Sequence, residues 1–331
     1  MTRFALPLSA LLCAMSFAAS LAIGSEVMGP GLVIGALVAP DPDSLDHLIL
    51  LTQRLPRALM ALQIGAAMAV SGVVLQGLTR NPLASPTTLG INAGAAFGLV
   101  AGALIFGLAP RAQGWAALAG ALAGPALTLA VARSVGLSRD PRGAALILSG
   151  ALVAMLLGGL VQALLLAEPL RRQEFLAWIT GNVNHAHVAR LADTGWITAL
   201  ALLMLWSLSR PLSLILLGPE KAASAGVNVP LVTRLALAGV AVAAGSAVAV
   251  SGPIAFLGLV VPHLARAMAG ASLPRLVPVA ALLDASLCLL ADLVARRAFL
   301  PFVTHTGVVL DLLGGLVFVL IVHRLYLRRA A

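Results

Sequence analysis

The chain has 331 residues, of which 60% are hydrophobic and only 10% are charged. Soluble proteins carry roughly 25% charged residues, so this composition excludes a water-soluble globular protein and leaves room for about ten membrane-crossing helices of ~20 residues each. The net charge of +9 comes from basic residues scattered between apolar segments, which argues against a nucleic-acid-binding protein and indicates loop charges that orient a membrane protein.

The first apolar segment follows Arg3 and runs from residue 4 to residue 24. A secretory signal peptide is one interpretation, with residues 18–20 as a weak cleavage context. The segment is longer than a typical signal core and more apolar segments follow it, so we interpret it as a retained first helix. The two cysteines, Cys13 and Cys288, lie in separate apolar runs, which excludes a disulfide framework and a thiolate zinc site.

Charge-free runs separated by helix breakers predict an all-α polytopic membrane protein that forms a single transmembrane domain over residues 1–331. The ten predicted helices lie near 4–24, 56–79, 90–108, 114–134, 143–167, 192–209, 231–251, 253–269, 276–295 and 305–322. The eighth is short and is interrupted by Pro262, His263 and Arg266. Broken helices are tolerated at membrane depth where they line a cavity or are buried in protein.

The distribution of Lys and Arg predicts the orientation. If the N-terminus is cytoplasmic and ten helices alternate, thirteen basic residues lie on the inner side and eight on the outer side, as the positive-inside rule requires. The acidic loop that carries Asp41, Asp43 and Asp46 then lies outside. Both termini are therefore predicted to be cytoplasmic, together with the segment 210–230.

Small residues recur at helical spacing in two predicted helices, as Gly94 with Gly98 and as Gly120 with Gly124. Small residues let helix backbones approach closely in a membrane, where no hydrophobic force drives helices together. The pattern predicts a packed helix bundle and carries no information about a substrate.

Signatures of catalysis are absent from the sequence. The only lysine, Lys221, lies between Glu220 and Ala222, whereas an ATP-binding P-loop needs a Lys followed by Ser or Thr. The chain also has no HExxH or GxSxG motif, so we expect no catalytic, cofactor-binding or metal-binding residues. A metal site at His185 and His187 remains an alternative to a hydrogen-bonded loop, although two ligands fall short of a tetrahedral set.

Three carboxylates lie within predicted helices, where burial is expensive: Asp284, Asp292 and Asp311. One interpretation is a proton or cation relay, as in a secondary transporter. The other is structural, either hydrogen bonding between helices or contact with an aqueous cavity. We favour the structural interpretation because no Lys or Arg lies midway in a predicted helix as a partner.

Five polar, Gly-containing or Pro-containing stretches interrupt the apolar pattern. They are Arg54 to Arg57 with Gln76 and Gly77 near the far end of the same helix, 81–95, 217–228, 251–266 and 292–296. In this order and spacing they resemble the FecCD/BtuC-type permeases, the membrane subunits of ATP-binding-cassette (ABC) importers for iron-siderophores, haem and vitamin B12. The resemblance runs from about residue 50 to the carboxyl end.

The resemblance implies a BtuC-like bundle of ten helices of the type II importers, in the bacterial cytoplasmic membrane. Such a permease pairs with a second permease subunit as a homodimer or heterodimer. Two ATP-binding subunits lie below the pair, and a periplasmic or lipid-anchored substrate-binding protein docks on top. The stretch 86–95 and the loop 181–187 look most like the ferric-citrate branch, which favours an iron-siderophore as cargo. The chain itself would be no enzyme.

The resemblance also assigns roles to residues. Docking of the binding protein falls to Arg54, Arg57 and Arg296. Coupling to the ATPase falls to Leu217, Gly218, Glu220, Ala222, Gly226 and Val227. Gating turns, which we expect at the cytoplasmic side, fall to Asn81, Pro82, Gly90, Gly252, Pro253, Pro262, His263 and Arg266.

The sequence departs from the family pattern near its carboxyl end. Asp284 stands where the family commonly has Gly, Asp311 is unusual, and no proline follows Gly314 and Gly315. A proton-coupled secondary transporter that uses Asp284, Asp292 and Asp311 therefore stays open as the alternative function.

Overall fold

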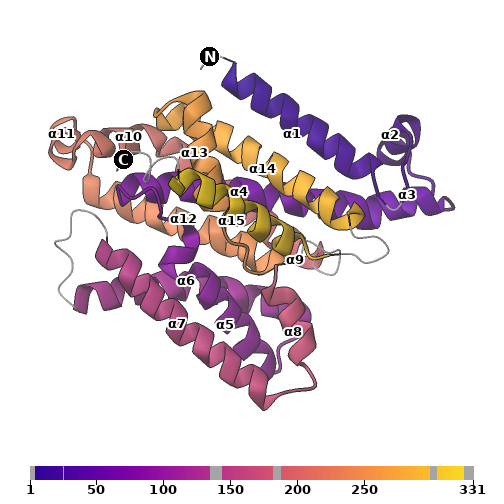
Figure 1. Ribbon diagram of the computed structural model, residues 1–331, viewed down its shortest axis with the longest axis horizontal. Helices are drawn as coiled ribbons and strands as arrows, with labels where there is room; N and C mark the ends of the chain where they lie inside the picture. The colour runs from indigo at the N-terminus through magenta and orange to yellow at the C-terminus, as the bar shows by residue number, and fades with distance from the viewer. Residues whose placement is uncertain (1–3, 25, 135–143, 182–187, 299–303, 324–331) are drawn as a thin grey trace.

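The computed structural model describes residues 4–24, 26–134, 144–181, 188–298 and 304–323, and within these ranges its regular elements are helical (Figure 1). A π-helical turn spans Leu50–Arg54 and a 3-10 turn spans Pro86–Leu89. The α-helices are α1 Ala5–Ala22, α2 Pro30–Val38, α3 Leu45–Ile49, α4 Leu55–Leu78, α5 Ile91–Leu104, α6 Pro110–Ser134, α7 Ala144–Ala167, α8 Arg172–Ile179, α9 Val188–Ser207, α10 Ser209–Leu217, α11 Pro219–Ser224, α12 Val229–Ser251, α13 Leu257–Ala269, α14 Leu273–Arg297 and α15 Thr306–Val322.

Each of the ten ranges expected from the sequence contains most or all of one apolar helix: α1, α4, α5, α6, α7, α9, α12, α13, α14 and α15. Among the described residues, seven helical segments are long and apolar enough to cross a membrane, whereas α5, α13 and α15 are shorter apolar helices. The prediction of an all-α, multi-pass membrane protein is therefore confirmed. The number of crossings stays a prediction.

The start of α13 differs from the expected boundary. It begins at Leu257 rather than at Pro253, because Gly252 and Phe256 have φ values of +78° and +63° that no α-helix accommodates. Three short helices, α2, α3 and α8, lie in segments that we treated as loops, because their apolar runs are too short to cross a membrane.

Helix α4 is the centre of the bundle. Its apolar window is 83% buried, against 28% for those of α7 and α9. It packs against α12, α13 and α14, and α1 packs on α14 (Figure 1). A Cβ at Gly65 would collide with the backbone of α14, and one at Gly72 with the backbone of Gly258 in α13, so glycine is what allows these helices to approach α4.

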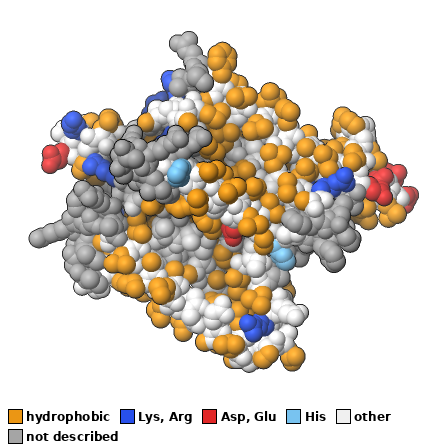
Figure 2. Space-filling model, viewed as in Figure 1, with side chains coloured by type: hydrophobic (Ala, Val, Ile, Leu, Met, Phe, Trp, Pro, Cys, Tyr) orange, Lys and Arg blue, Asp and Glu red, His pale blue; other side chains and the backbone are white. Residues whose placement is uncertain are grey.

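The molecule has two distinct ends along its long axis (Figure 1). Helix α11 lies at one end, called the α11 end, and α2 and α3 lie at the other, called the α3 end. Figure 2 shows hydrophobic side chains over much of the viewed face, while many of the charged side chains lie toward these two ends. This distribution is that of a protein whose middle lies in lipid.

The pair α5 and α6 packs through the predicted glycines. A Cβ on Gly94 would collide with the carbonyl oxygen of Gly120, and one on Gly98 with that of Ala116. A Cβ on Gly124 would in turn collide with the carbonyl oxygen of Gly90. The two small-residue patterns therefore face each other, which is one way in which they pack the bundle that the sequence predicted.

Gly94→Ala should destabilise the fold, because its methyl group has to displace the α6 backbone. Overpacking of this kind costs about 1–3 kcal/mol. The matched control is Gly159→Ala in α7, where an added Cβ has nothing within 4 Å. Thermal unfolding of the two variants in detergent measures the difference. Equal melting temperatures would contradict the close α5–α6 contact.

Candidate functional site

The π-helical turn before α4 places Arg54 against the end of α1. The Arg54 side chain is buried, and its Nη1 donates to the carbonyl oxygens of Leu21 and Ala22, both at 2.9 Å. Its Nη2 donates to the carbonyl oxygen of Glu26 at 2.9 Å. The last carbonyls of a helix lack partners within the helix, and a cation is favourable beside them. Arg54 therefore caps α1.

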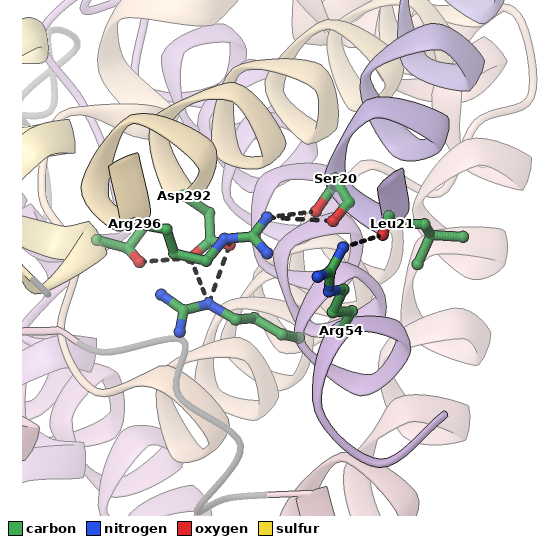
Figure 3. Close-up of polar contacts among 7 residues, drawn as sticks. Ser20, Leu21, Arg54, Asp292 and Arg296 are labelled. Atoms are coloured by element: carbon green, nitrogen blue, oxygen red, sulfur yellow. Dashed lines mark hydrogen bonds and ion pairs between the residues drawn. The ribbon is translucent and has the colours of Figure 1, made fainter. Parts of the chain in front are cut away.

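Next to Arg54, the side chain of Asp292 in α14 forms the centre of a cluster of polar side chains (Figure 3). Its carboxylate is fully buried. Arg57 Nε donates to both of its oxygens, at 2.8 and 3.0 Å, and Arg296 Nε lies 3.1 Å from Oδ2. Thr306 Oγ1 donates to Oδ1 at 2.8 Å. One carboxylate thus joins α4, α14 and the first residue of α15.

The neighbouring arginines extend this group to α1. Arg296 Nη2 donates to the hydroxyl of Ser20 at 3.0 Å and to its carbonyl oxygen at 3.3 Å (Figure 3). Arg297 Nη1 donates to the carbonyl oxygen of Gly24 at 3.0 Å. We call Arg54, Arg57, Asp292, Arg296 and Arg297 the arginine cluster. It contains four cations and one anion, so it keeps an excess of positive charge.

The three residues assigned to docking therefore lie together, and all three already make polar contacts within the chain. Arg54 and Arg57 are buried, and the Arg296 side chain is 10% exposed. Sequence reasoning missed that Asp292 joins two of them, because we looked for a cation midway in a helix. Both cations come from helix ends, and the Asp292 to Arg296 spacing of four residues was the available signal.

The residues assigned to gating divide into two places. At the α11 end, His263 Nε2 lies 3.2 Å from the carbonyl oxygen of Pro82. Arg266 Nη1 donates to Gln76 Oε1 at 2.7 Å, and Gln76 Nε2 donates to the carbonyl oxygen of Leu259 at 3.2 Å. These contacts hold the loop after α4 and the helix α13 to the end of α4.

The other turn lies away from the α11 end, which differs from our expectation that both turns share one side. A Cβ on Gly252 would collide with the carbonyl oxygen of Trp178 in α8, and one on Gly181 would lie 2.7 Å from the carbonyl oxygen of Pro253. The cause is that α12 runs from the α11 end and has crossed the bundle by Ser251 (Figure 1).

The remaining turn residues shape the loop between α4 and α5. Asn81 Oδ1 accepts from the backbone N–H of Leu83 at 2.9 Å. Gly90 has a φ of +76°, which favours glycine. Pro262 lies buried inside α13.

The residues assigned to coupling surround α11. Leu217 is 71% exposed, and Glu220 and Gly226 are exposed as well. Gly218 and Gly226 have φ values of +138° and +82°, so both turns that flank α11 favour glycine. Ala222 is fully buried against the core, and Val227 is half-buried. The segment thus presents Leu217 outward while Ala222 attaches it to the bundle.

The three membrane carboxylates do not form a chain. Asp292 is held by two arginines, and Asp311 Oδ1 accepts from the backbone N–H of Ala255 at 3.2 Å. Asp284 is fully buried, and within the described part of the chain neither of its oxygens has a hydrogen-bond partner. The described residues contain no group of three or more potential metal ligands. His185 and His187 lie outside the described residues.

Asp292→Ala should destabilise the protein strongly, because two arginines lose their shared carboxylate. Removing one partner of a buried ion pair costs about 3–5 kcal/mol. The control is Asp193→Ala, which removes the partner of Arg111, a side chain that is 70% exposed. Solvent screens that pair, so its loss should change the melting temperature much less. A similar shift for both variants would contradict the structural role of Asp292.

Comparison with known proteins places the chain in a family. The model of the FecCD transport family matches residues 12–324. The hemin transport system permease protein HmuU of Yersinia pestis is 38% identical over 289 residues, covering 85% of each chain. The ferric enterobactin transport system permease protein FepD of Escherichia coli is 34% identical over 323 residues, covering 97% of this chain and 95% of that protein.

A solved structure supports the fold over the same length. It is an ABC transporter of the metal-chelate type in an inward-facing conformation, with a TM-score of 0.81 and 28% sequence identity, covering 98% of this chain and 100% of that one. Because the family model and the relatives match almost end to end, the chain belongs to the FecCD transport family, whose matching structure has the BtuC-like importer fold.

Proposed function

We propose that the chain is a permease subunit of a bacterial ABC importer and forms the path of a ferric chelate, such as an iron-siderophore, across the cytoplasmic membrane. The observation that carries the proposal is the family match over residues 12–324. Relatives named for ferric enterobactin and for Fe(3+)-citrate support iron-siderophore cargo. The relative named for hemin keeps haem as a second candidate.

ATP hydrolysis is assigned to separate subunits. Lys221, the only lysine, is not followed by Ser or Thr, so the chain cannot build a P-loop. Two ATPases would bind at the α11 end, with the exposed Leu217 inserted into a groove on one of them. Their closure on ATP would change which conformation of the bundle is favoured, because a ligand shifts an equilibrium by its differential affinity for the two states. A second permease, identical or related, would complete the assembly.

Docking of a substrate-binding protein is assigned to the α3 end. Asp292 neutralises one of the four cations in the arginine cluster, so the cluster keeps a local positive field beside the acidic side chains of Asp41, Asp43 and Asp46 at the same end. Such a field attracts carboxylates on a partner and speeds encounter. Because Arg54, Arg57 and Arg296 also hold helices together, their replacement would affect docking and stability at once. Arg297, which is exposed, is the better probe of docking.

The orientation proposed from the positive-inside rule puts the α11 end in the cytoplasm. Helix α1 begins and α15 ends toward that end in Figure 1, which supports cytoplasmic termini. The contacts of His263 with Pro82 and of Arg266 with Gln76 then lie on the cytoplasmic side. We assign these contacts to the gate that opens when cargo leaves.

A proton-coupled secondary transporter is the second candidate, and the buried carboxyl of Asp284 is the observation that favours it. Burying an ionised carboxylate without a partner is very costly, and intramembrane carboxylates serve as proton carriers in transporters. Asp292 cannot share that role while two arginines hold it.

Uptake assays in proteoliposomes separate the two candidates. With binding protein and ATPases present, we expect radioactive ferric chelate to accumulate only when ATP is enclosed with the ATPases. A pH gradient without ATP should give no accumulation, and Asp284→Asn should leave ATP-driven uptake intact. Uptake driven by the gradient in liposomes that lack the ATPases would refute the importer proposal.

Leu217→Glu should uncouple the permease from its ATPases. A charge in place of an exposed apolar anchor disrupts the hydrophobic insertion, and the loss of such an anchor weakens a complex by roughly tenfold or more. Leu170→Glu is the control, because Leu170 is 97% exposed beside α8 and far from α11. Copurification of the ATPases and ATP-driven uptake provide the measurements. Wild-type values for Leu217→Glu would exclude the assigned role.

A further inference from the structure

A groove of about 560 Å³ opens between α6 and α12, away from the arginine cluster and from the proposed gate. Its walls are almost entirely apolar, and Leu89 and Leu146 contribute to the lining. The residues that α6 and α12 contribute are Leu122, Pro125, Ala126, Leu129, Arg133, Val229, Pro230, Thr233, Arg234, Leu237, Ala238 and Ala241.

The groove lies beside a close contact of the two helices. At Gly245 an added Cβ would lie 2.8 Å from Cβ of Ala121, and α6 and α12 are in contact. From there the groove runs toward the C-terminus of α6 and the N-terminus of α12. The twelve residues from Leu122 to Arg133 span ~17 Å along the helix axis. That is about half of the ~30 Å hydrocarbon thickness of a bilayer, so the groove has the depth of one leaflet.

Positive charge gathers at the α11 end of the groove. Arg133 and Arg234 both line it, one from each helix, and both are exposed. Within the described part of the chain, neither side chain has a hydrogen-bond or ion-pair partner. Val229 and Pro230, also in the lining, form the first turn of the 23-residue helix α12. The positive end of the helix dipole adds to the two guanidinium groups there.

We propose that this groove is a binding site for an anionic phospholipid. One acyl chain lies along the apolar walls from Leu129 to Leu122, and the lipid phosphate lies between Arg133 and Arg234. Both halves of the site match this ligand, because an acyl chain can pack against the apolar walls by van der Waals contact and basic pockets between membrane helices bind anionic headgroups. Two other occupants fit less well. An apolar surface of a second protein subunit would not neutralise the two arginines. A free inorganic anion would not cover the apolar walls.

Native mass spectrometry of the full-length chain in detergent tests the site, with phosphatidylglycerol and phosphatidylcholine as probes. The double variant Arg133→Gln with Arg234→Gln should weaken phosphatidylglycerol binding by roughly 30-fold, since the two basic residues together contribute ~2 kcal/mol. Phosphatidylcholine binding should change little. The control, Arg210→Gln with Arg275→Gln, removes the same charge from exposed positions that do not line the groove. Equal losses in both double variants would overturn the proposal.

Groove filling tests the apolar half. Ala238→Trp places a large ring in the groove, whereas Ala151→Trp places it on an exposed face of α7. Only the former should lower phosphatidylglycerol binding, and thermal unfolding checks that both variants fold. Displacement of the lipid by inorganic phosphate alone would show that the walls do not matter and would overturn the proposal. Crosslinking from position 238 to a second copy of the chain, rather than to lipid, would do the same.

Discussion

The carboxylate of Asp292 is the constraint on which the geometry of the α3 end depends. It is fully buried, and it is stable there because Arg57, Arg296 and Thr306 donate to it or pair with it. A buried charge that loses its partners is far more costly than a solvated one, so α4, α14 and the start of α15 are fixed to one another. Arg296 also holds Ser20 of α1. Helices from the beginning and the end of the chain are therefore expected to move together, because their separation would leave buried charges without partners and would cost free energy.

The opposite end of α4 is held differently. In the described part of the chain, Arg266 contacts the neutral Gln76 rather than a carboxylate, and His263 contacts a backbone carbonyl. Contacts of this kind contribute about 0.5–3 kcal/mol each, less than the separation of a buried ion pair costs. The α11 end can therefore rearrange while the α3 end stays intact. That asymmetry fits the proposed arrangement, in which cargo is received at the α3 end and released at the α11 end.

The sequence predicted the class of fold and much of the helix pattern, because charge-free runs and small-residue spacing report directly on membrane burial and helix contact. Gly94 and Gly120 are examples, since each faces the other's helix. The short helices α2, α3 and α8 were missed because no span-length apolar run marks them. The arginine cluster was found only as separate basic residues. Its organisation depends on a contact between residues 57 and 292, which no local pattern contains, and on the π-helical turn that directs Arg54 at α1.

In the proposed assembly, force from the ATPases would enter the bundle through α11. Helix α11 connects α10 to α12, and Ala222 fixes it against the core while Leu217 stays outside. A displacement of α11 therefore acts first on α12, which packs against α4, α6 and α9. The proposed lipid lies between α6 and α12 at this same end, where Arg133 and Arg234 face one headgroup. Any change in the α6–α12 distance would stretch or compress that pair of contacts, so the anionic lipid content of the membrane would bias the conformational equilibrium that the ATPases drive.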